Sequence, residues 1–467
     1  MKNKKALIFL DLDFVIRHFV MNDTFLELSK KFDLTFVIVR DPSSDKQGIK
    51  LDISKLPIKD YVYFDIPRAR SGKWFNLSQM LVFYNQRGTK NYATGRALIK
   101  GMVSPKLFRL FMIFSRPGLM QITRWFMLKK IGHYKPLDTF LNDQTPDLVL
   151  HPTVLTGFVI NDLLQSCAAL DIPLVLLMNS WDNPSMKAVA AGVPDRLVVW
   201  GDQTRRHAIE YMCIPENLVE SFGAAQFQLY RTPETMSDSE LRKLFEVPAN
   251  LPIILYGGAG RGQHESEYIK RLDDMVETGQ VPPCHILYRP HPWRGPLADG
   301  EVSFYDLNCK HVTMDPHLRG YYKRVVLGNG QDQFEMTNYS TTKQVLTLVS
   351  GVISPLSTIL LESVMLGKPV LMYFPSDDLK KPMGRVTDIS LKAAQFDDFW
   401  GSPGVHFCLE KDKFAEEFKL MLKEAGDPQV TKSLKEHASK FVVMDGPTYG
   451  ERLATLADQL TNKRITQ

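Results

Sequence analysis

The sequence alternates short apolar runs with longer segments of helical periodicity, and this alternation restricts the possible folds more than any other feature. Near-continuous apolar runs rich in β-branched residues are typical of strands that are buried on both faces of a parallel sheet. Their alternation with helical segments predicts βαβ units. The runs form two series of six: first Ala6–Leu10, Thr35–Val39, Tyr61–Phe64, Leu148–His151, Leu174–Met178 and Arg196–Trp200, then Pro252–Tyr256, His285–Tyr288, Arg324–Leu327, Leu346–Ser354, Pro369–Tyr373 and His406–Leu409.

Two such series predict an α/β chain with two doubly wound, Rossmann-like domains. The segment Tyr230–Glu246 interrupts the periodicity with proline and polar residues, and it marks the seam between the domains. We therefore expect an N-terminal domain over residues 1-235, a second domain over 248-430 and C-terminal helices over 431-467. Ligands of open α/β sheets bind outside the carboxyl ends of the strands, which predicts a site in a cleft between two facing domains.

Composition and length agree with this prediction, because a chain of 467 residues with 44% hydrophobic and 23% charged residues is ordinary for a globular protein. The five cysteines are far apart and form no C-x-x-C pair, so neither a zinc knuckle nor a redox pair is expected. No run approaches the roughly 18 apolar residues of a membrane span, and Asp11 and Asp13 interrupt the apolar run after the basic start Met1–Lys5. We expect a cytoplasmic protein without a cofactor or a metal ion.

One window of the predicted N-terminal domain is strongly basic. Residues 66-137 contain fourteen Lys or Arg and no Asp or Glu, and aromatic residues interleave with the basic ones at Phe108, Phe111, Phe114, Trp125 and Phe126. This combination suits an amphipathic segment at an anionic membrane surface. A helical pair that packs its aromatic side chains inward, or a solvated basic face, is the simpler alternative. Nucleic-acid grooves also combine basic and aromatic residues, but no RRM, KH or zinc signature is present, so no nucleic-acid partner is expected.

The strongest chemical signal is the run Tyr288-Arg289-Pro290-His291-Pro292, which directly follows a predicted strand. The prolines force the chain to leave the sheet sharply, so His291 is expected at the carboxyl end of the strand, with Arg289 and Arg294 nearby. Arginine offers bidentate hydrogen bonds to phosphate oxygens, and histidine can protonate a departing phosphate. An incidental surface turn is the alternative.

A second signal follows the buried run that ends at Ser354. Ser357 and Thr358 are expected to open a helix that Gly367 closes. Hydroxyl groups together with free backbone N–H groups at a helix N-terminus form an anion site. Glu362, one turn further along, is a candidate acceptor for ribose hydroxyls. Capping of an ordinary core helix would explain Ser357 and Thr358 equally well.

A glycine run follows the first strand of the second domain. Gly257 and Gly258 would let a donor nucleotide approach the backbone closely. The run fits neither the G-x-G-x-x-G fingerprint nor the P-loop spacing, so it is a weak signal by itself.

Together these motifs resemble those of GT-B glycosyltransferases that combine an HP motif with a downstream Ser/Thr motif. Bacterial sialyltransferases and Kdo transferases, which use CMP-sugars, carry such a pair. The CDP-glycerol glycerophosphotransferases of teichoic acid synthesis are similar, and the corresponding residues here are Arg289–Pro292, Ser357-Thr358 and Gly367–Pro369. Asp445-Gly446 followed by Arg452 is similar to the tail pattern of this group. The resemblance implies that His291 and the Ser357-Thr358 pair hold the nucleotide phosphate.

In the first domain the resemblance is present only in outline. Asn179–Pro184 follows a strong strand run and is similar to an S-W-D-N stretch of surface-polysaccharide transferases. Asp182 is the first candidate for a general base that deprotonates the acceptor, although it can equally cap the next helix or pair with Lys187. His151, after the preceding strand, is a second candidate base. The expected acceptor contacts from this stretch are Trp181 and Asn183.

The first strand run ends in Asp11 and Asp13 and continues into Arg17-His18. In the fold that the chain resembles, residues at these positions often touch the acceptor, and the two aspartates are further candidate bases. The run D-L-D-F-V also resembles the opening of haloacid-dehalogenase phosphatases. The usual Gly-Thr is missing, however, and the motifs of the second domain have no counterpart in that family.

These observations favour an inverting, metal-independent glycosyltransferase. The expected donor is a CMP- or UDP-type nucleotide sugar, and the expected acceptor is a surface polysaccharide or a lipid-linked glycan. Residues 66-137 are expected to contact the inner face of the cytoplasmic membrane. The alternatives are a CDP-glycerol-type phospho-alditol transferase and a catalytically silent GT-B scaffold. A UDP-GlcNAc 2-epimerase is less favoured, because Ser354–Ser357 replaces the Ser-Gly-Gly run of that family.

Overall fold

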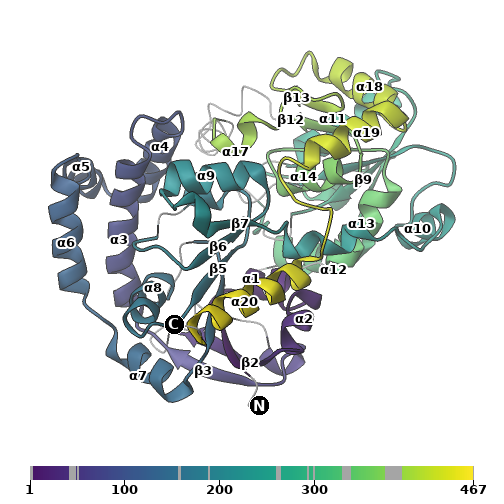
Figure 1. Cartoon of the computed structure of the whole chain (residues 1–467). Helices are drawn as coiled ribbons and strands as arrows, with labels where there is room; N and C mark the ends of the chain where they lie inside the picture. The colour runs from purple at the N-terminus through teal and green to yellow at the C-terminus, as the bar shows by residue number, and fades with distance from the viewer. Residues whose placement is uncertain are drawn as a thin grey trace. The chain divides into compact units, whose positions relative to one another are not determined.

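The computed structural model describes residues 4–41, 49, 52–155, 159–187, 190–258, 265–291, 294–297, 300–328, 338–373 and 392–465 (Figure 1). The chain forms two compact units. Unit 1 comprises Met1–Gln228, Ala393–Gln395 and Lys440–Gln467, and unit 2 comprises Leu229–Lys392 and Phe396–Ser439. The segment 431-467, where we expected C-terminal helices, contains most of α19 (Pro428–Ala438), which belongs to unit 2, and α20 (Tyr449–Ile465), which belongs to unit 1.

Unit 1 is built on a seven-stranded parallel sheet in the order β3-β2-β1-β4-β5-β6-β7. The order reverses between β1 and β4, so the sheet is doubly wound. Every residue of β4 and of β5 is buried, which explains their continuous apolar sequences. The strands are β1 (Lys4–Leu10), β2 (Phe32–Arg40), β3 (Tyr61–Asp65), β4 (Leu148–Thr153), β5 (Leu174–Met178), β6 (Arg196–Val199) and β7 (Val219–Ser221).

The basic window, residues 66-137, folds as a helical layer of unit 1, which we call the basic insertion. Helices α5 and α6 pack on α3, and Figure 1 shows the three side by side. They share a core of their own around Trp74, Phe83 and Phe111. The helices of unit 1 are α1 (Asp13–Phe19), α2 (Leu26–Ser29), α3 (Arg68–Asn85), α4 (Tyr92–Met102), α5 (Pro105–Phe114), α6 (Leu119–Ile131), α7 (Lys135–Gln144), α8 (Ile160–Ala169), α9 (Asp202–Met212) and α20.

Unit 2 has a six-stranded parallel sheet in the order β10-β9-β8-β11-β12-β13, which reverses between β8 and β11. The strands are β8 (Ile253–Gly257), β9 (His285–Arg289), β10 (Val312–Met314), β11 (Gly351–Ser354), β12 (Val370–Tyr373) and β13 (Val405–Cys408). Its helices include α10 (Asp238–Leu244), α11 (Glu265–Glu277), α12 (Pro316–Tyr321), α13 (Tyr339–Leu348), α14 (Thr358–Met365), α18 (Phe414–Glu424) and α19. The predicted architecture of two doubly wound, Rossmann-like domains is confirmed.

Some of the predicted strands are wrong in detail. Arg324–Leu327 is not a strand, because Tyr322–Val326 forms a π-helical turn that buries Tyr322 and Val326 at helical spacing. The start of the predicted run Leu346–Ser354 belongs to α13, and the strand begins at Gly351. The short strands β7 and β10 were not predicted, since three residues are too few to show a period.

Candidate functional site

The carboxyl edge of the unit 2 sheet brings Gly257 and Ser354 together at the point where the strand order reverses. The Ser354 hydroxyl donates a hydrogen bond of 2.8 Å to the Gly257 carbonyl. A Cβ atom on Gly257 would lie 3.2 Å from Cγ2 of Ile359 and 3.3 Å from Oγ of Ser354, so there is little room for a side chain at the residue that ends β8. The carboxyl edge at such a reversal of strand order is where open α/β sheets bind their ligands.

Gly258 borders a buried ionic cluster. A Cβ atom on it would lie 2.6 Å from Oε1 of Glu265, at the start of α11. Glu265 accepts a 2.5 Å hydrogen bond from Tyr288 and pairs with Arg294 at 2.6 Å. Arg294 also pairs with Glu301 and is only 4% exposed. The Arg294 guanidinium is thus held between two carboxylates, and its predicted contact with the donor stays a prediction.

Arg289 ends β9 and is held by buried partners. Its Nη1 atom lies 3.3 Å from Oδ2 of Asp315, and its Nη2 atom donates to Thr342 at 3.1 Å. Burial alone would raise the pKa of Asp315, but the Arg289 charge and the hydrogen bonds from His317 lower it, and the pKa lies below its ordinary value. The ionised Asp315 therefore fixes a cation at the carboxyl edge of the sheet.

His291 follows β9 by two residues and is half-buried. Its carbonyl accepts a 2.9 Å hydrogen bond from the Arg294 backbone, which makes the expected sharp turn. Pro292, the second proline of the motif, lies outside the described residues. The structure thus places His291 two residues beyond the end of β9, where the prolines predicted it.

The helix predicted after Ser354 is present as α14, which begins at Thr358 and ends shortly before Gly367 (φ +72°). Ser357 occupies the N-cap position, yet its side chain makes no capping hydrogen bond. Ser357 and Thr358 are both half-buried. Helix capping therefore does not account for the Ser357 hydroxyl, which adjoins the backbone N–H groups at the N-terminus of α14.

Glu362, on the second turn of α14, has a partner that the sequence did not suggest. It is 7% exposed and accepts a hydrogen bond of 2.5 Å from the Tyr230 hydroxyl. Burial and the nearby Glu362 charge raise the pKa of Tyr230 well above its ordinary value, so the phenol stays protonated and donates. The Arg289 charge lowers the pKa of the same phenol, so Tyr230 lies within the electrostatic range of Arg289.

The carboxyl edge of the unit 1 sheet gathers a second set of predicted residues, also where the strand order reverses. His151 in β4 is fully buried, its Nδ1 atom lies 3.1 Å from the Phe9 carbonyl, and its Nε2 atom lies 3.9 Å from Oδ2 of Asp11. A carbonyl only accepts, so Nδ1 carries the proton and Nε2 faces the carboxylate. Burial lowers the pKa of His151, although the Asp11 charge opposes this.

His18 lies on α1, which begins at Asp13 and contains Arg17. Its Nδ1 atom lies 2.5 Å from Oδ1 of Asn179, the residue that follows β5. Burial and the adjacent Arg17 charge lower the pKa of His18 to about 3. His18 is therefore neutral at physiological pH and hydrogen-bonds to the end of β5.

The stretch after β5 is largely buried. Trp181 is 3% exposed and packs edge-on against Phe441 at 5.8 Å between ring centroids. Asn183 is fully buried and accepts a 2.8 Å hydrogen bond from the Ser180 backbone, so both side chains hold the loop in place. Asp182 is half-buried and accepts from Asn183 at 3.3 Å. The side chain of Lys187, an alternative partner for Asp182, lies outside the described residues.

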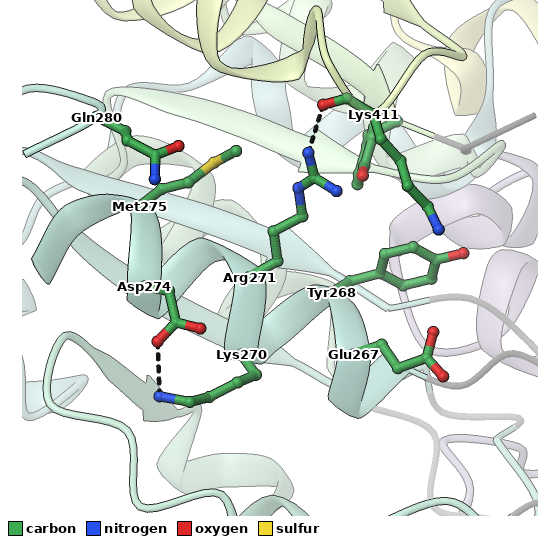
Figure 2. Close-up of a pocket in the computed structure, with 9 residues that line it drawn as sticks. Glu267, Tyr268, Lys270, Arg271, Asp274, Met275, Gln280 and Lys411 are labelled. Atoms are coloured by element: carbon green, nitrogen blue, oxygen red, sulfur yellow. Dashed lines mark hydrogen bonds and ion pairs between the residues drawn. The ribbon is translucent and has the colours of Figure 1, made fainter. Parts of the chain in front are cut away.

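A cavity of about 520 Å³ lies along α11 in unit 2 (Figure 2). Arg271 donates to the Lys411 carbonyl, and Lys270 pairs with Asp274 at 2.8 Å. None of the predicted site residues lines it, so it is not the predicted donor site. The lining residues are Glu267, Tyr268, Lys270, Arg271, Asp274, Met275, Gln280, Tyr373 and Lys411.

Among the described residues, no group of three or more His, Cys, Asp or Glu side chains is arranged to hold a metal ion. Within the same part of the chain, no helix is both long and apolar enough to cross a membrane.

The residues of these clusters that were not predicted as site residues include Asn179, Tyr230, Glu265 and Asp315. Asn179 and Asp315 directly follow strands, which is the signal that could have found them. Tyr230 and Glu265 contact partners that are distant in the sequence, and no local sequence pattern identifies either residue.

Solved structures are similar to this chain over nearly its whole length. A proposed UDP-N-acetylglucosamine 2-epimerase from Listeria monocytogenes matches 99% of this chain and 98% of its own, with 10% identity and a TM-score of 0.50. The wall teichoic acid polymerase TagF matches 100% and 91% at 10% identity, with a TM-score of 0.49. A glycosyltransferase from Rickettsia africae matches 98% and 99% at 9% identity, with a TM-score of 0.46.

No protein-family model matches the sequence, and no curated protein sequence is significantly similar to it. The similarity to solved structures therefore concerns the fold alone. The two parallel α/β sheets, of seven and six strands, form a GT-B-like architecture.

Proposed function

We propose that this chain is a glycosyltransferase that moves a sugar from a CMP- or UDP-type nucleotide-sugar donor to a surface polysaccharide or a lipid-linked glycan. The observation that carries the proposal is the carboxyl edge of the unit 2 sheet. There Gly257 ends β8, and the Ser357 hydroxyl adjoins the N-terminus of α14 without serving as its cap. Both features lie at the reversal of strand order, where open α/β sheets bind nucleotides.

In this proposal the donor phosphate binds at the N-terminus of α14, where free N–H groups and the helix dipole favour an anion. Ser357 and Thr358 add hydroxyl donors. Arg289, which pairs with Asp315, contributes positive charge at the carboxyl end of β9. His291 hydrogen-bonds or protonates the departing phosphate, and stabilisation of the leaving group lowers the barrier where charge develops.

On the acceptor side, a base in unit 1 removes the proton of the acceptor hydroxyl. The oxygen then attacks the anomeric carbon, the bond to the nucleotide breaks, and the configuration inverts. Asp182 is the first candidate for this base, and its half-buried carboxylate is more accessible than the buried Asp11. The remaining candidates for base or acceptor contact are Asp13, His151, Arg17, His18, Trp181 and Asn183. The reaction as proposed needs no metal ion.

The test is a thermal-shift screen of the purified protein against CMP, CDP, UDP, GDP and their sugar conjugates. A ligand at 100 times its dissociation constant stabilises the fold by about 2.7 kcal/mol, which raises the melting temperature by roughly 5 to 10 °C. We expect a selective rise with CMP or UDP and their sugars. A selective rise with CDP would replace the proposal by a phospho-alditol transferase. No rise with any nucleotide, in the presence and absence of acceptor glycan, would contradict an enzyme and favour a scaffold.

A further inference from the structure

We propose that the outer face of the α5–α6 hairpin docks on the surface of an anionic phospholipid membrane. The inner sides of both helices pack on α3, where Phe111 is 2% exposed and Met120 is 1% exposed. The outer sides carry large apolar side chains that are between 41% and 65% exposed. The outer face consists of Leu110, Ile113, Phe114, Leu119, Ile122, Trp125 and Phe126.

These side chains form a patch and are not a random scatter. Seven of the eighteen exposed large hydrophobic side chains among the described residues lie between positions 110 and 126. Leu110, Ile113 and Phe114 follow the spacing of one helix face, as do Ile122, Trp125 and Phe126 on the second helix. Concentrated exposed apolar surface of this kind marks an interaction site.

The structure divides the aromatic residues of the insertion between two roles. Phe108 packs edge-on against Phe83 at 5.7 Å, and Phe111 is buried with it in the helical core. Phe114, Trp125 and Phe126 point to the outside. The inward-packing alternative therefore holds for the first two side chains and fails for the other three.

The charges around the patch select the partner. The exposed basic side chains of the hairpin are Lys106, Arg109, Arg116, Arg124, Lys129 and Lys130. No acidic residue lies within 66-137, so no carboxylate from the insertion balances them. Lys129 lies over the Trp125 ring at 5.2 Å, which places a cation directly beside the apolar patch. Other basic residues of the window act internally, as Arg70 does in its pair with Asp162.

An anionic lipid surface satisfies both parts of this face. Basic side chains bind anionic headgroups while the apolar side chains enter the boundary with the acyl chains. A second copy of the chain would bring two basic faces together, which is unfavourable. The aliphatic Leu110, Ile113, Leu119 and Ile122 offer no stacking surface for the bases of a nucleic acid. Helices of 10 and 13 residues are too short to span a bilayer and are expected to lie in its plane.

The first experiment measures flotation of the full chain with vesicles of phosphatidylcholine alone and of an equal mixture with phosphatidylglycerol. We expect binding to the anionic vesicles, with a blue shift of Trp125 emission and quenching by brominated lipid, because Trp125 is 63% exposed. The variant Ile122→Ser/Trp125→Ser should lose this binding, whereas Leu420→Ser, at a 44% exposed leucine of α18, should keep it. Equal binding to neutral vesicles, no binding to either, or full binding by the double variant would overturn the proposal.

A second pair of variants tests the charges. Each basic residue near an anionic membrane strengthens binding by about fivefold, so Lys129→Gln/Lys130→Gln should weaken it by about 30-fold. Lys419→Gln/Lys423→Gln removes two exposed charges from α18 and should have no comparable effect. An equal loss in both double variants would refute a specific role for the hairpin, as would a protein that forms dimers through this face without lipid. Vesicle binding requires no nucleotide, so it succeeds or fails independently of the proposed transferase activity.

Discussion

Replacement of Ser357 by alanine separates a structural role from a ligand-binding role at the N-terminus of α14. Serine at an N-cap position usually accepts a hydrogen bond from the first turn, and its removal costs about 1 kcal/mol. In a unit of this size such a loss lowers the melting temperature by about 2 to 4 °C. The Ser357 side chain makes no capping hydrogen bond, so Ser357→Ala should leave the melting temperature nearly unchanged.

The same substitution should weaken nucleotide binding. A hydrogen bond to a charged group contributes about 1.5 to 3 kcal/mol, which corresponds to about 10- to 150-fold in affinity. Because Ser357 is half-buried and partly screened by solvent, we expect the lower end, near 10-fold. Isothermal titration calorimetry with the nucleotide identified by the thermal-shift screen measures this change directly.

Ser237 provides the matched control within unit 2. Its side chain accepts a hydrogen bond from the Glu240 backbone and forms a complete capping box at the start of α10. Ser237→Ala should therefore lower the melting temperature by about 2 to 4 °C and leave nucleotide affinity unchanged. If Ser357→Ala behaves like Ser237→Ala, the hydroxyl is an ordinary cap and the proposed phosphate contact is wrong.

Three further predictions concern other parts of the chain. Asp182→Asn should keep donor binding but lower the transfer rate by about 10²- to 10⁴-fold in a coupled assay; an unchanged rate would assign the base elsewhere. Arg289→Ala leaves the buried Asp315 without its cation and should lower the free energy of unfolding by roughly 3 to 5 kcal/mol in urea titrations; a loss below about 1 kcal/mol would show that the pair is not structural. The pKa of His18 is lowered to about 3 when folded, so between about pH 6.5 and pH 5 only the unfolded chain takes up its proton. His18 should therefore remove up to about 1.4 kcal/mol of stability per pH unit on acidification over this range, and His18→Gln should show a shallower loss; the lowered pKa of His151 acts in the same direction.

The fold was predictable because a parallel strand is a local pattern. Buried strands such as β5 and β12 read as continuous apolar runs, and the intervening helical periods fix their order along the chain. The prediction failed where an element was too short to show a period, as in β10 with its three residues. It also failed at the π-helical turn Tyr322–Val326, because a short apolar segment there is compatible with a strand as well as with a helical turn.

The site was predictable only to the extent that its residues end a strand or begin a helix. His291 and Ser357 could be placed from neighbouring prolines and glycines, because those residues act within a few positions. Pairing over long separations left no local trace. The Tyr230 contact to Glu362 spans 132 positions, and nothing near Arg294 showed that two carboxylates would surround it.

Helix α20 belongs to unit 1, the unit that also contains β1. Tyr449 and Leu453 of α20 lie in the core of unit 1, α2 packs on α20, and Lys31, two residues after α2, pairs with Asp458 of α20. Unit 2, by contrast, is almost one continuous stretch of the chain. Because the N-terminal part of a chain emerges first from the ribosome, the whole of unit 2 has been synthesised before α20 emerges. During synthesis, unit 1 is therefore the later of the two units to close its core, and it exposes the α20-binding surface until α20 has emerged from the ribosome.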